Sequence, residues 1–217
     1  MIERRTVSTQ NELRDAYNRL FAEAPVGEKP RFYRWILSLF ETPGPPPTLL
    51  DIACGTGGML EAARDTGWTA IGCDLSDQAL ELARKRGVTN CLLADGEALP
   101  LPDAAFSAVT HLGNLEHFLD PAAGAREVRR VLAPGGRAII MLPNSYYSGD
   151  LWRLIRTGYG PNHHQAIDRF ATLNEWRDLL AEAGLQVQKV IAYNKFKWWK
   201  KLLPKALAYH FVYVCTR

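Results

Sequence analysis

From residue 48 onward, short apolar runs alternate with helix-length amphipathic segments, and this alternation constrains the fold more than any other feature of the chain. The apolar runs predict strands, and the segments between them predict crossover helices. Strands joined in this way lie parallel, in an open doubly wound α/β sheet that binds its ligand beyond the carboxyl ends of the strands. Strands are predicted at 48–53, 69–74, 88–95, 105–112, 137–143, 185–194 and 207–215.

Helix start signals support the same interpretation. Ser76, Asp120 and Thr172 each stand where an N-cap residue is needed, and Pro121 follows Asp120 at the first turn. Glu175, three residues after Thr172, completes a capping box. Helices are predicted over 58–66, 76–87, 120–132 and 172–184.

The first 47 residues differ from the rest and predict an N-terminal helical cap with a connector. Apolar residues recur there at helical spacing, and the segment ETPGPPPT (41–48) can form neither a helix nor a central strand, because proline removes donors and fixes φ. We therefore divide the chain into a cap and Pro-rich connector, 1–47, and a main domain, 48–217. The cap residues at helical spacing are Leu13, Tyr17, Leu20 and Phe21.

Composition narrows the class of protein. Hydrophobic residues make up 47% of the 217 residues, which excludes a disordered chain. The four cysteines form no C-x-x-C pair, so the sequence predicts neither a zinc knuckle nor a redox motif of that type. Free thiols, the lack of an apolar leader and the lack of an 18-residue apolar run favour a cytoplasmic protein. The oligomeric state is not predicted.

The C-terminal part is basic. From residue 183 to the end there are seven Lys or Arg and no acid, whereas the net charge of the whole chain is +3. In the stretch 195–205, KFKWWKKLLPK, lysines alternate with tryptophan and leucine, which suits peripheral contact with an anionic membrane. A connection whose apolar residues cap the sheet edge is the alternative. One short basic stretch on an acidic body does not predict a nucleic-acid partner.

The segment LLDIACGTGGML (49–60) carries the main ligand-binding signal. A buried strand ends at Asp51, and Gly55 and Gly57 then allow a tight turn whose backbone comes close to a ligand. A dinucleotide-binding G-x-G-x-x-G loop would need its third glycine at position 60, where Leu60 stands. An NAD(P)-dependent oxidoreductase therefore stays an alternative with a weakened signal.

The same segment resembles motif I of the class I S-adenosylmethionine-dependent methyltransferases. Further segments resemble the later motifs of that family, in order and at the expected spacing through residue 144. The subgroup most similar to this set is the small-molecule one, of the methyltransferase type 11 kind. The matching segments are AIGCDLS, ADGEALPLPDAAFSAV, HLGNLEHFLDP and REVRRVLAPGGRAIIMLPN.

The resemblance implies a Rossmann-like, mostly parallel seven-stranded sheet in the order 3-2-1-4-5-7-6, with strand 7 antiparallel. It implies S-adenosylmethionine as cofactor, Asp74 on the ribose hydroxyls and Asp95 on the adenine amino group. A carboxylate suits the ribose because it accepts from both hydroxyl groups. The other residues expected to contact the cofactor are Asp51, Ala53, Cys54, Gly55, Thr56, Gly57, Leu75, Gly96, Glu97, His111 and Tyr17.

The resemblance further implies methyl transfer to a small molecule, with a hydroxyl as the expected acceptor group and a lipid-linked or apolar acceptor as one expectation. A non-catalytic S-adenosylmethionine-binding module is an alternative. Histidine is the natural general base near neutral pH, and His117 and His164 are the candidates. His117 could instead bond the backbone near the cofactor, and His164 could be a plain loop residue.

Glu116 and His117 resemble part of a metal-binding Glu-x-x-Glu-His motif of some quinone O-methyltransferases. Gly113 replaces the first carboxylate of that motif, so no metal is expected.

The segment 146–170 is a long insertion between the fifth strand and the next helix. In this fold it is expected to lie over the acceptor, where its aromatic side chains would wall an apolar pocket. Ordinary packing is the alternative. The aromatic residues are Tyr146, Tyr147, Trp152 and Tyr159.

Overall fold

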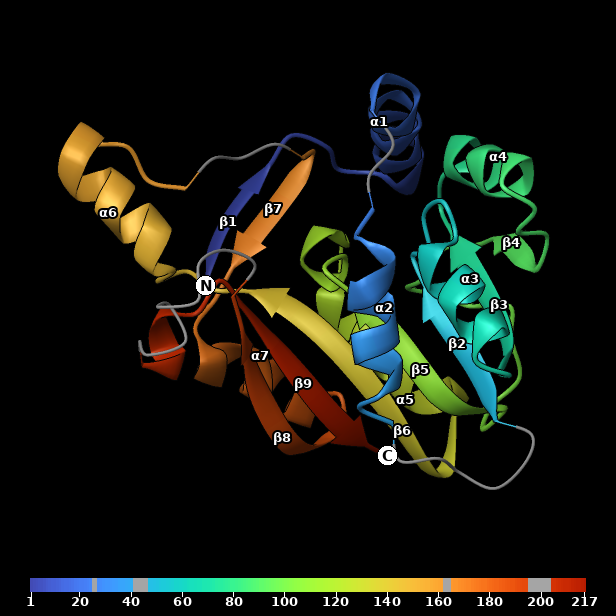
Figure 1. Ribbon diagram of the computed structural model, residues 1–217. Helices are drawn as coiled ribbons and strands as arrows, with labels where there is room; N and C mark the ends of the chain where they lie inside the picture. Colours follow the sequence, from blue (N-terminus) through green and yellow to red (C-terminus); the bar gives the residue numbers. More distant parts are fainter. Residues whose placement is uncertain (25–26, 41–46, 162–164, 195–203) are drawn as a thin grey trace.

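A seven-stranded mixed sheet in the order β4-β3-β2-β5-β6-β9-β8 organises the computed structural model, which describes residues 1–24, 27–40, 47–161, 165–194 and 204–217 (Figure 1). β9 runs antiparallel to both of its neighbours, and the other pairs are parallel. The predicted strand order and the antiparallel seventh strand are confirmed. The strands are β2 (Thr48–Ile52), β3 (Thr69–Asp74), β4 (Cys91–Leu93), β5 (Phe106–Leu112), β6 (Leu132–Pro143), β8 (Gln186–Tyr193) and β9 (His210–Thr216).

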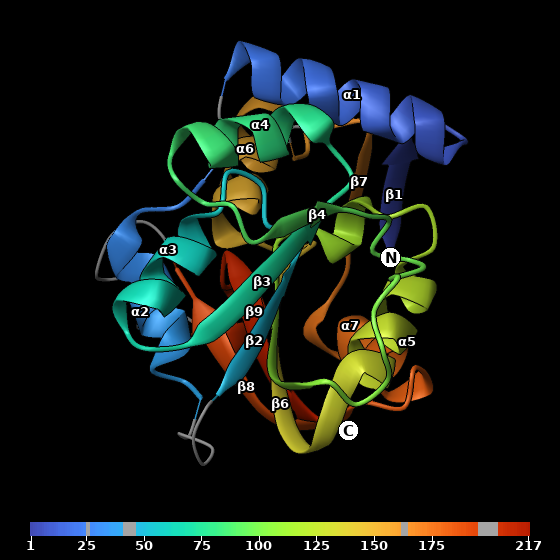
Figure 2. The same ribbon diagram turned by 90° about the vertical axis from the view of Figure 1, so that its right-hand side faces the viewer.

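Helices cover both faces of this sheet. α2 and α3 lie on one face and α5 and α7 on the other, as Figure 2 shows. Two buried apolar clusters fill the interfaces, and neighbouring strand residues such as Leu49 and Leu50 belong to opposite clusters, as the alternation of side chains along a strand requires. The helices are α1 (Gln10–Glu23), α2 (Pro30–Leu37), α3 (Gly58–Asp65), α4 (Asp77–Lys85), α5 (Pro121–Val131), α6 (Ser148–Thr157) and α7 (Leu173–Glu182), with 3-10 turns η1 (Leu115–His117) and η3 (Lys205–Leu207).

The three predicted N-caps are confirmed. Ser76 Oγ accepts from the Ala79 N–H at 3.0 Å, and Thr172 Oγ1 accepts from the Glu175 N–H at 3.2 Å. Asp120 caps α5 by accepting from two backbone N–H groups. These local bonds start the helices at the positions that the sequence indicates.

A second, two-stranded sheet was not predicted. β1 (Ile2–Arg5) pairs antiparallel with β7 (Ile167–Phe170), whereas the sequence predicts a helical cap for this part of the chain. All four residues of β1 are exposed, so the strand shows no alternation of apolar and polar side chains. The buried Arg169 guanidinium donates to the Glu3 carboxylate at 2.7 Å and ties the two strands together.

α1 lies over the carboxyl ends of β2 and β3 (Figures 1 and 2). Its Asn18 side chain donates to Asp77 Oδ1 at 2.8 Å and accepts from Ser76 Oγ at 2.7 Å, so α1 is attached to the start of α4. The N-terminal helix therefore covers the edge of the sheet at which ligands bind in this fold.

Several sequence predictions concern residues outside the described ranges. His164, one of the candidate bases, is among them, as is all of the 195–205 stretch except Pro204 and Lys205. Within the described ranges, no helix is both long enough and apolar enough to cross a membrane.

The attachment of α7 to the sheet gives a test of the fold. The Trp176 side chain is fully buried, and its Nε1–H donates to the Pro143 carbonyl at 2.7 Å. Trp176→Ala should lower the free energy of unfolding by about 3–5 kcal/mol, measured by urea denaturation. Trp176→Phe should lower it by about 1–3 kcal/mol because it leaves the buried carbonyl unpaired.

Trp152→Ala is the matched control. The Trp152 side chain is 65% exposed on α6, so its removal should change the free energy of unfolding by less than about 0.5 kcal/mol. Equal losses at the two tryptophans would contradict the placement of α7.

Candidate functional site

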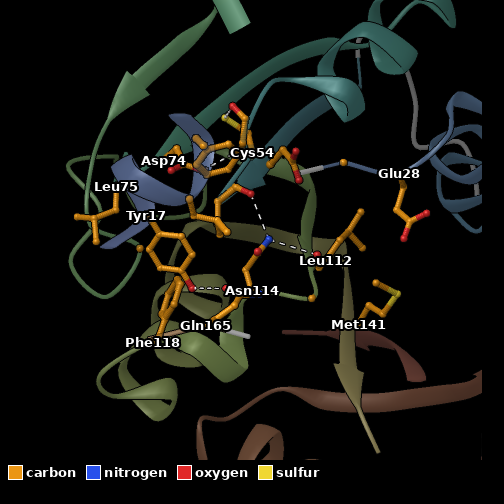
Figure 3. Close-up of a pocket in the computed structure, with 18 of the residues that line it drawn as sticks. Tyr17, Glu28, Cys54, Asp74, Leu75, Leu112, Asn114, Phe118, Met141 and Gln165 are labelled. Atoms are coloured by element: carbon orange, nitrogen blue, oxygen red, sulfur yellow. Dashed lines mark hydrogen bonds between the residues drawn. The ribbon is translucent and has the colours of Figure 1, made fainter. Parts of the chain in front are cut away.

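A cavity of about 290 Å³ lies between α1 and the carboxyl ends of the central strands (Figure 3). The sequence predicted a ligand site at this edge. One end of the cavity is formed by the turn after β2 and by the residues that follow β3 and β4. The other end is formed by residues after β5, by the ends of β6 and β8, and by the start of β9.

The turn after β2 has an unusual backbone. Ala53 adopts a φ of 56°, which is uncommon for a residue with a side chain, and Gly55 and Gly57 have φ values of 54° and 81°. The Asn114 amide holds Ala53 in place, because its Nδ2 donates to the Ala53 carbonyl at 3.1 Å and to the Leu112 carbonyl at 3.2 Å (Figure 3). The turn is thereby fastened to the end of β5.

Asp74 connects this turn to β3. Its carboxylate is buried and accepts from the Gly55 N–H and from the Ser76 N–H, both at 2.8 Å. Burial raises the pKa of Asp74 to about 6, while the two backbone bonds act to lower it. Each carboxylate oxygen has a second lone pair, so the group can accept further hydrogen bonds from a ligand in the cavity.

Asp51, at the end of β2, is the second buried carboxylate. Its Oδ1 accepts from Thr110 Oγ1 at 2.7 Å, and the side chain lines the cavity. Burial raises the pKa of Asp51 to about 7, and the charge of Asp74 raises it further, against the lowering effect of the Thr110 bond. The site therefore holds two acidic groups in a poorly solvated place.

Most of the predicted cofactor contacts lie on the cavity. Asp95 Oδ1 accepts from the Glu97 N–H at 2.8 Å and so fixes the loop after β4. Tyr17, on α1, donates from its hydroxyl to Gln165 Oε1 at 2.9 Å and lies over the same space (Figure 3). The predicted residues that line the cavity are Tyr17, Asp51, Ala53, Cys54, Gly55, Asp74, Leu75, Asp95, Gly96 and Glu97.

Two predicted residues of the glycine turn do not line the cavity. Thr56 Oγ1 accepts from Arg86 Nη1 at 3.1 Å, on the far side of the turn. Gly57 packs on Val88, because a Cβ at position 57 would lie 2.8 Å from Val88 Cγ1. These residues shape the turn without facing the cavity.

His111 and His117 are also absent from the cavity lining. His111 is fully buried with its ring centroid 4.9 Å from that of Phe118, and burial lowers its pKa to about 3. The His117 Nδ1 faces the Ile167 carbonyl and lies 3.6 Å from Asp168 Oδ1. Burial lowers the pKa of His117. Burial thus favours the neutral form of both rings, and the contacts of His117 join η1 to β7.

The end of the cavity beside β9 contains residues that the sequence predictions do not include. His210, the first residue of β9, and Tyr209 just before it line the cavity together with Tyr193 and Met141. A signal for His210 existed, because an antiparallel seventh strand must begin at the edge where the parallel strands end. No comparable signal existed for Asn114, whose role depends on the unusual conformation of Ala53.

The predicted aromatic wall from the insertion is wrong. Tyr146, Trp152 and Tyr159 are 54%, 65% and 71% exposed, and none lines the cavity. Tyr147 instead packs edge-on against Tyr209, with ring centroids 4.9 Å apart. The insertion continues into α6, which projects away from the sheet (Figure 1), so aromatic side chains from β8, β9 and α2 take its place.

Carboxylic residues dominate the charged lining of the cavity. Five carboxylic residues line it, whereas no lysine or arginine does among the residues that the structure describes. A lining of this kind suits a ligand with hydroxyl, amino and cationic groups, and it does not suit a pyrophosphate. The five residues are Glu28, Asp51, Asp74, Asp95 and Glu97.

The buried carboxyl of Asp51 gives a pH-dependent prediction. Its pKa is about 7 in the folded chain and about 4 in the unfolded chain. Stability from the bound proton is therefore present below pH 4 and lost as the pH rises through 7. The Asp51→Asn side chain stays neutral at every pH and keeps an acceptor for Thr110. The free energy of unfolding of the wild type should therefore fall relative to that of Asp51→Asn by about 2–4 kcal/mol as the pH rises from 4 to 8.

Urea denaturation across that pH range measures the difference. Asp65→Asn, at an exposed carboxylate on α3, controls for the loss of one negative charge. A constant difference between Asp51→Asn and the wild type at every pH would contradict the raised pKa of the buried Asp51.

Comparison with known proteins agrees with this geometry. Residues 50–140 match the family described as a methyltransferase domain. The chain is 39% identical over 98 residues to the demethylmenaquinone methyltransferase of Corynebacterium kroppenstedtii, a match that covers 45% of this chain and 42% of that protein. It is 28% identical over 180 residues to the ubiquinone biosynthesis O-methyltransferase of Ruegeria pomeroyi, covering 78% of this chain and 73% of that protein.

Among solved structures, the CcbJ methyltransferase of Streptomyces caelestis shares the fold, with a TM-score of 0.70 and 18% identity over 95% of this chain and 98% of that chain. The chain spans about half the length of several curated relatives that it matches. The sequence over the central strands matches the family, and the topology of the whole sheet shows the same fold. Residues 50–140 therefore match a methyltransferase domain, and the chain has the fold of the class I, S-adenosylmethionine-dependent methyltransferases and is similar to the small-molecule enzymes of that class.

Proposed function

We propose that this chain binds S-adenosylmethionine at the acidic end of the cavity and transfers its methyl group to a hydroxyl of a small, apolar acceptor at the aromatic end. The observation that carries the proposal is the lining itself. Acidic residues gather at the carboxyl ends of β2, β3 and β4, Tyr193 and Tyr209 lie at the end of β8 and just before β9, and the described lining includes no lysine or arginine.

The residues of the acidic end fit the cofactor. Asp74 has free lone pairs for two ribose hydroxyls, and Asp95 can accept from an adenine amino group. Gly55 has a φ of 54° and lines the cavity without a side chain, so the turn presents its backbone to a ligand there. S-adenosylmethionine, when bound, supplies an electrophilic methyl group on a cationic sulfur, and the buried carboxylates of Asp51 and Asp74 complement that charge.

The residues of the other end fit an aromatic or otherwise apolar acceptor. Tyr193, Tyr209 and Met141 offer rings and a thioether for packing. The two relatives act, by their names, on demethylmenaquinone and in ubiquinone biosynthesis, and one of them is an O-methyltransferase. A ring hydroxyl of a quinone-like or phenolic compound is the acceptor that these facts support.

His210 is the residue that we assign to proton removal. Its imidazole lines the acceptor end, where it can take a proton from an acceptor hydroxyl as the oxygen attacks. His117 lies behind the cavity, on the Ile167 carbonyl, and can act only by holding β7 in position. The surrounding aromatic side chains exclude water from the reacting groups.

The proposal predicts transfer of a labelled methyl group from S-adenosylmethionine to a phenolic or quinol acceptor. Asp74→Ala should weaken S-adenosylhomocysteine binding by about 1.5–3 kcal/mol for each charge-assisted bond lost, measured by titration calorimetry. Asp65→Ala removes an exposed carboxylate outside the cavity and should leave the affinity unchanged.

The same assay separates the alternatives. Tight cofactor binding without transfer to any hydroxylated acceptor would favour a non-catalytic binding module. NADH binding in place of S-adenosylhomocysteine would favour an oxidoreductase. Unchanged affinity in Asp74→Ala would overturn the ribose assignment.

A second prediction concerns the base. His210→Gln should lower kcat by about 10²–10⁴ and remove the acidic limb of the pH–rate profile, while leaving cofactor affinity intact. His117→Gln and His164→Gln are the comparison variants. Full activity in His210→Gln would overturn the assignment of proton removal to His210, and a loss of the acidic limb confined to His164→Gln would move it to that histidine.

A further inference from the structure

Two cysteine thiols meet beside the turn that follows β2. Cys54 lines the cavity and is 8% exposed, and Cys91 opens the edge strand β4 and is half-buried. The two thiols influence each other's pKa: the neighbouring thiol raises the pKa of Cys54 and lowers that of Cys91. They come from positions 37 residues apart, so the fold and not the local chain brings them together.

Gly72 makes this approach possible. A Cβ at position 72 would lie 2.7 Å from Cys54 Sγ and 2.8 Å from Cys54 Cβ, so the Cys54 side chain fills the space that a side chain at 72 would need. Gly72 is the paired neighbour of Cys91 in the parallel strands β3 and β4. Paired residues of neighbouring strands point to the same face, which puts the Cys54 sulfur beside Cys91.

The other two cysteines are separated from this pair. Cys73 belongs to the apolar cluster on the opposite face of the sheet, together with Cys215 on β9. Cys54 and Cys91 both belong to the cluster that contains α2 and α3. The arrangement therefore places Cys54 beside Cys91 and away from Cys73 and Cys215.

We propose that Cys54 and Cys91 are a peroxide-sensitive dithiol, and that their oxidation to a disulfide closes the cofactor turn. In the first step a cysteine thiolate attacks a hydroperoxide, the O–O bond breaks, and a sulfenic acid and an alcohol or water form. The second thiol then displaces water from the sulfenic sulfur and forms the S–S bond. Two thiols and one hydroperoxide give one disulfide, one water and one alcohol, or two waters when the oxidant is hydrogen peroxide.

The environment distinguishes the two thiols. The neighbouring Cys54 thiol lowers the pKa of Cys91, whereas the Cys91 thiol and burial raise the pKa of Cys54. Cys91 is also the more exposed of the two. Cys91 is therefore the thiol that meets the oxidant, and Cys54 resolves the sulfenic acid.

A bond to Cys91 would move the backbone next to the site. Gly55, the next residue after Cys54, donates its N–H to Asp74, and the Cys54 N–H donates to the Cys73 carbonyl at 2.9 Å. Drawing Cys54 toward β4 displaces these groups and so reduces cofactor binding. This consequence rests on the proposed function, but formation of the bond does not.

The test treats the full-length chain with hydrogen peroxide, alkylates the remaining thiols and identifies tryptic peptides by mass spectrometry. Cys54, Cys73 and Cys91 fall on separate peptides, 35–64, 65–84 and 87–126. The expected product is a linked pair of 35–64 with 87–126, lighter by two hydrogens. S-adenosylhomocysteine affinity should fall about tenfold or more, as expected when one charge-assisted hydrogen bond is lost, and dithiothreitol should restore it.

Two variants serve as controls. Position 91 lies outside the cavity lining, so Cys91→Ser should keep its affinity for S-adenosylhomocysteine after peroxide treatment. Cys215→Ala should lose that affinity, as the wild type does. Oxygen adducts on separate peptides, or a link that includes Cys73, would overturn the pairing. A linked pair with unchanged affinity would overturn its effect on the turn. A linked pair in a chain that never bound S-adenosylhomocysteine would count against the proposed function alone.

Discussion

The hydrogen bond from the Gly55 N–H to the buried Asp74 carboxylate is the interaction on which the site depends. It joins the turn after β2 to the end of β3, and the Asn114 amide joins the same turn to β5. Two carboxylates, Asp51 and Asp74, are held away from water, which costs free energy unless they are hydrogen-bonded or protonated. The backbone bonds and the Thr110 hydroxyl supply that compensation, so the turn is rigid before any ligand arrives.

The topology of the sheet explains why the cavity has two different ends. β2, β3 and β4 run parallel, so their carboxyl ends bring acidic residues to one place. β9 runs the other way, so its first residue, His210, and the preceding Tyr209 reach the same edge from the opposite direction. The acidic residues and the Tyr209–His210 pair of the lining are thereby supplied by distant parts of the chain.

Short-range signals in the sequence predicted what depends on neighbouring residues. The caps at Ser76, Asp120 and Thr172 are of this kind, as is the glycine turn after Asp51. The predictions that failed concern contacts between distant segments. β1 has charged, exposed side chains and pairs with residues more than 160 positions away, so no local pattern marks it. The position of the insertion after the fifth strand predicts its aromatic residues at the cavity, but Tyr146, Trp152 and Tyr159 are exposed, because α6 projects away from the sheet and no local pattern indicates that orientation.

A crystal structure of the chain with S-adenosylhomocysteine tests the central claim most directly. The account predicts the ribose hydroxyls on the Asp74 carboxylate, the adenine amino group on Asp95, and the sulfur directed toward the end of the cavity that His210 lines. A ribose bound away from Asp74, or a sulfur that faces the solvent side of α1, would contradict it.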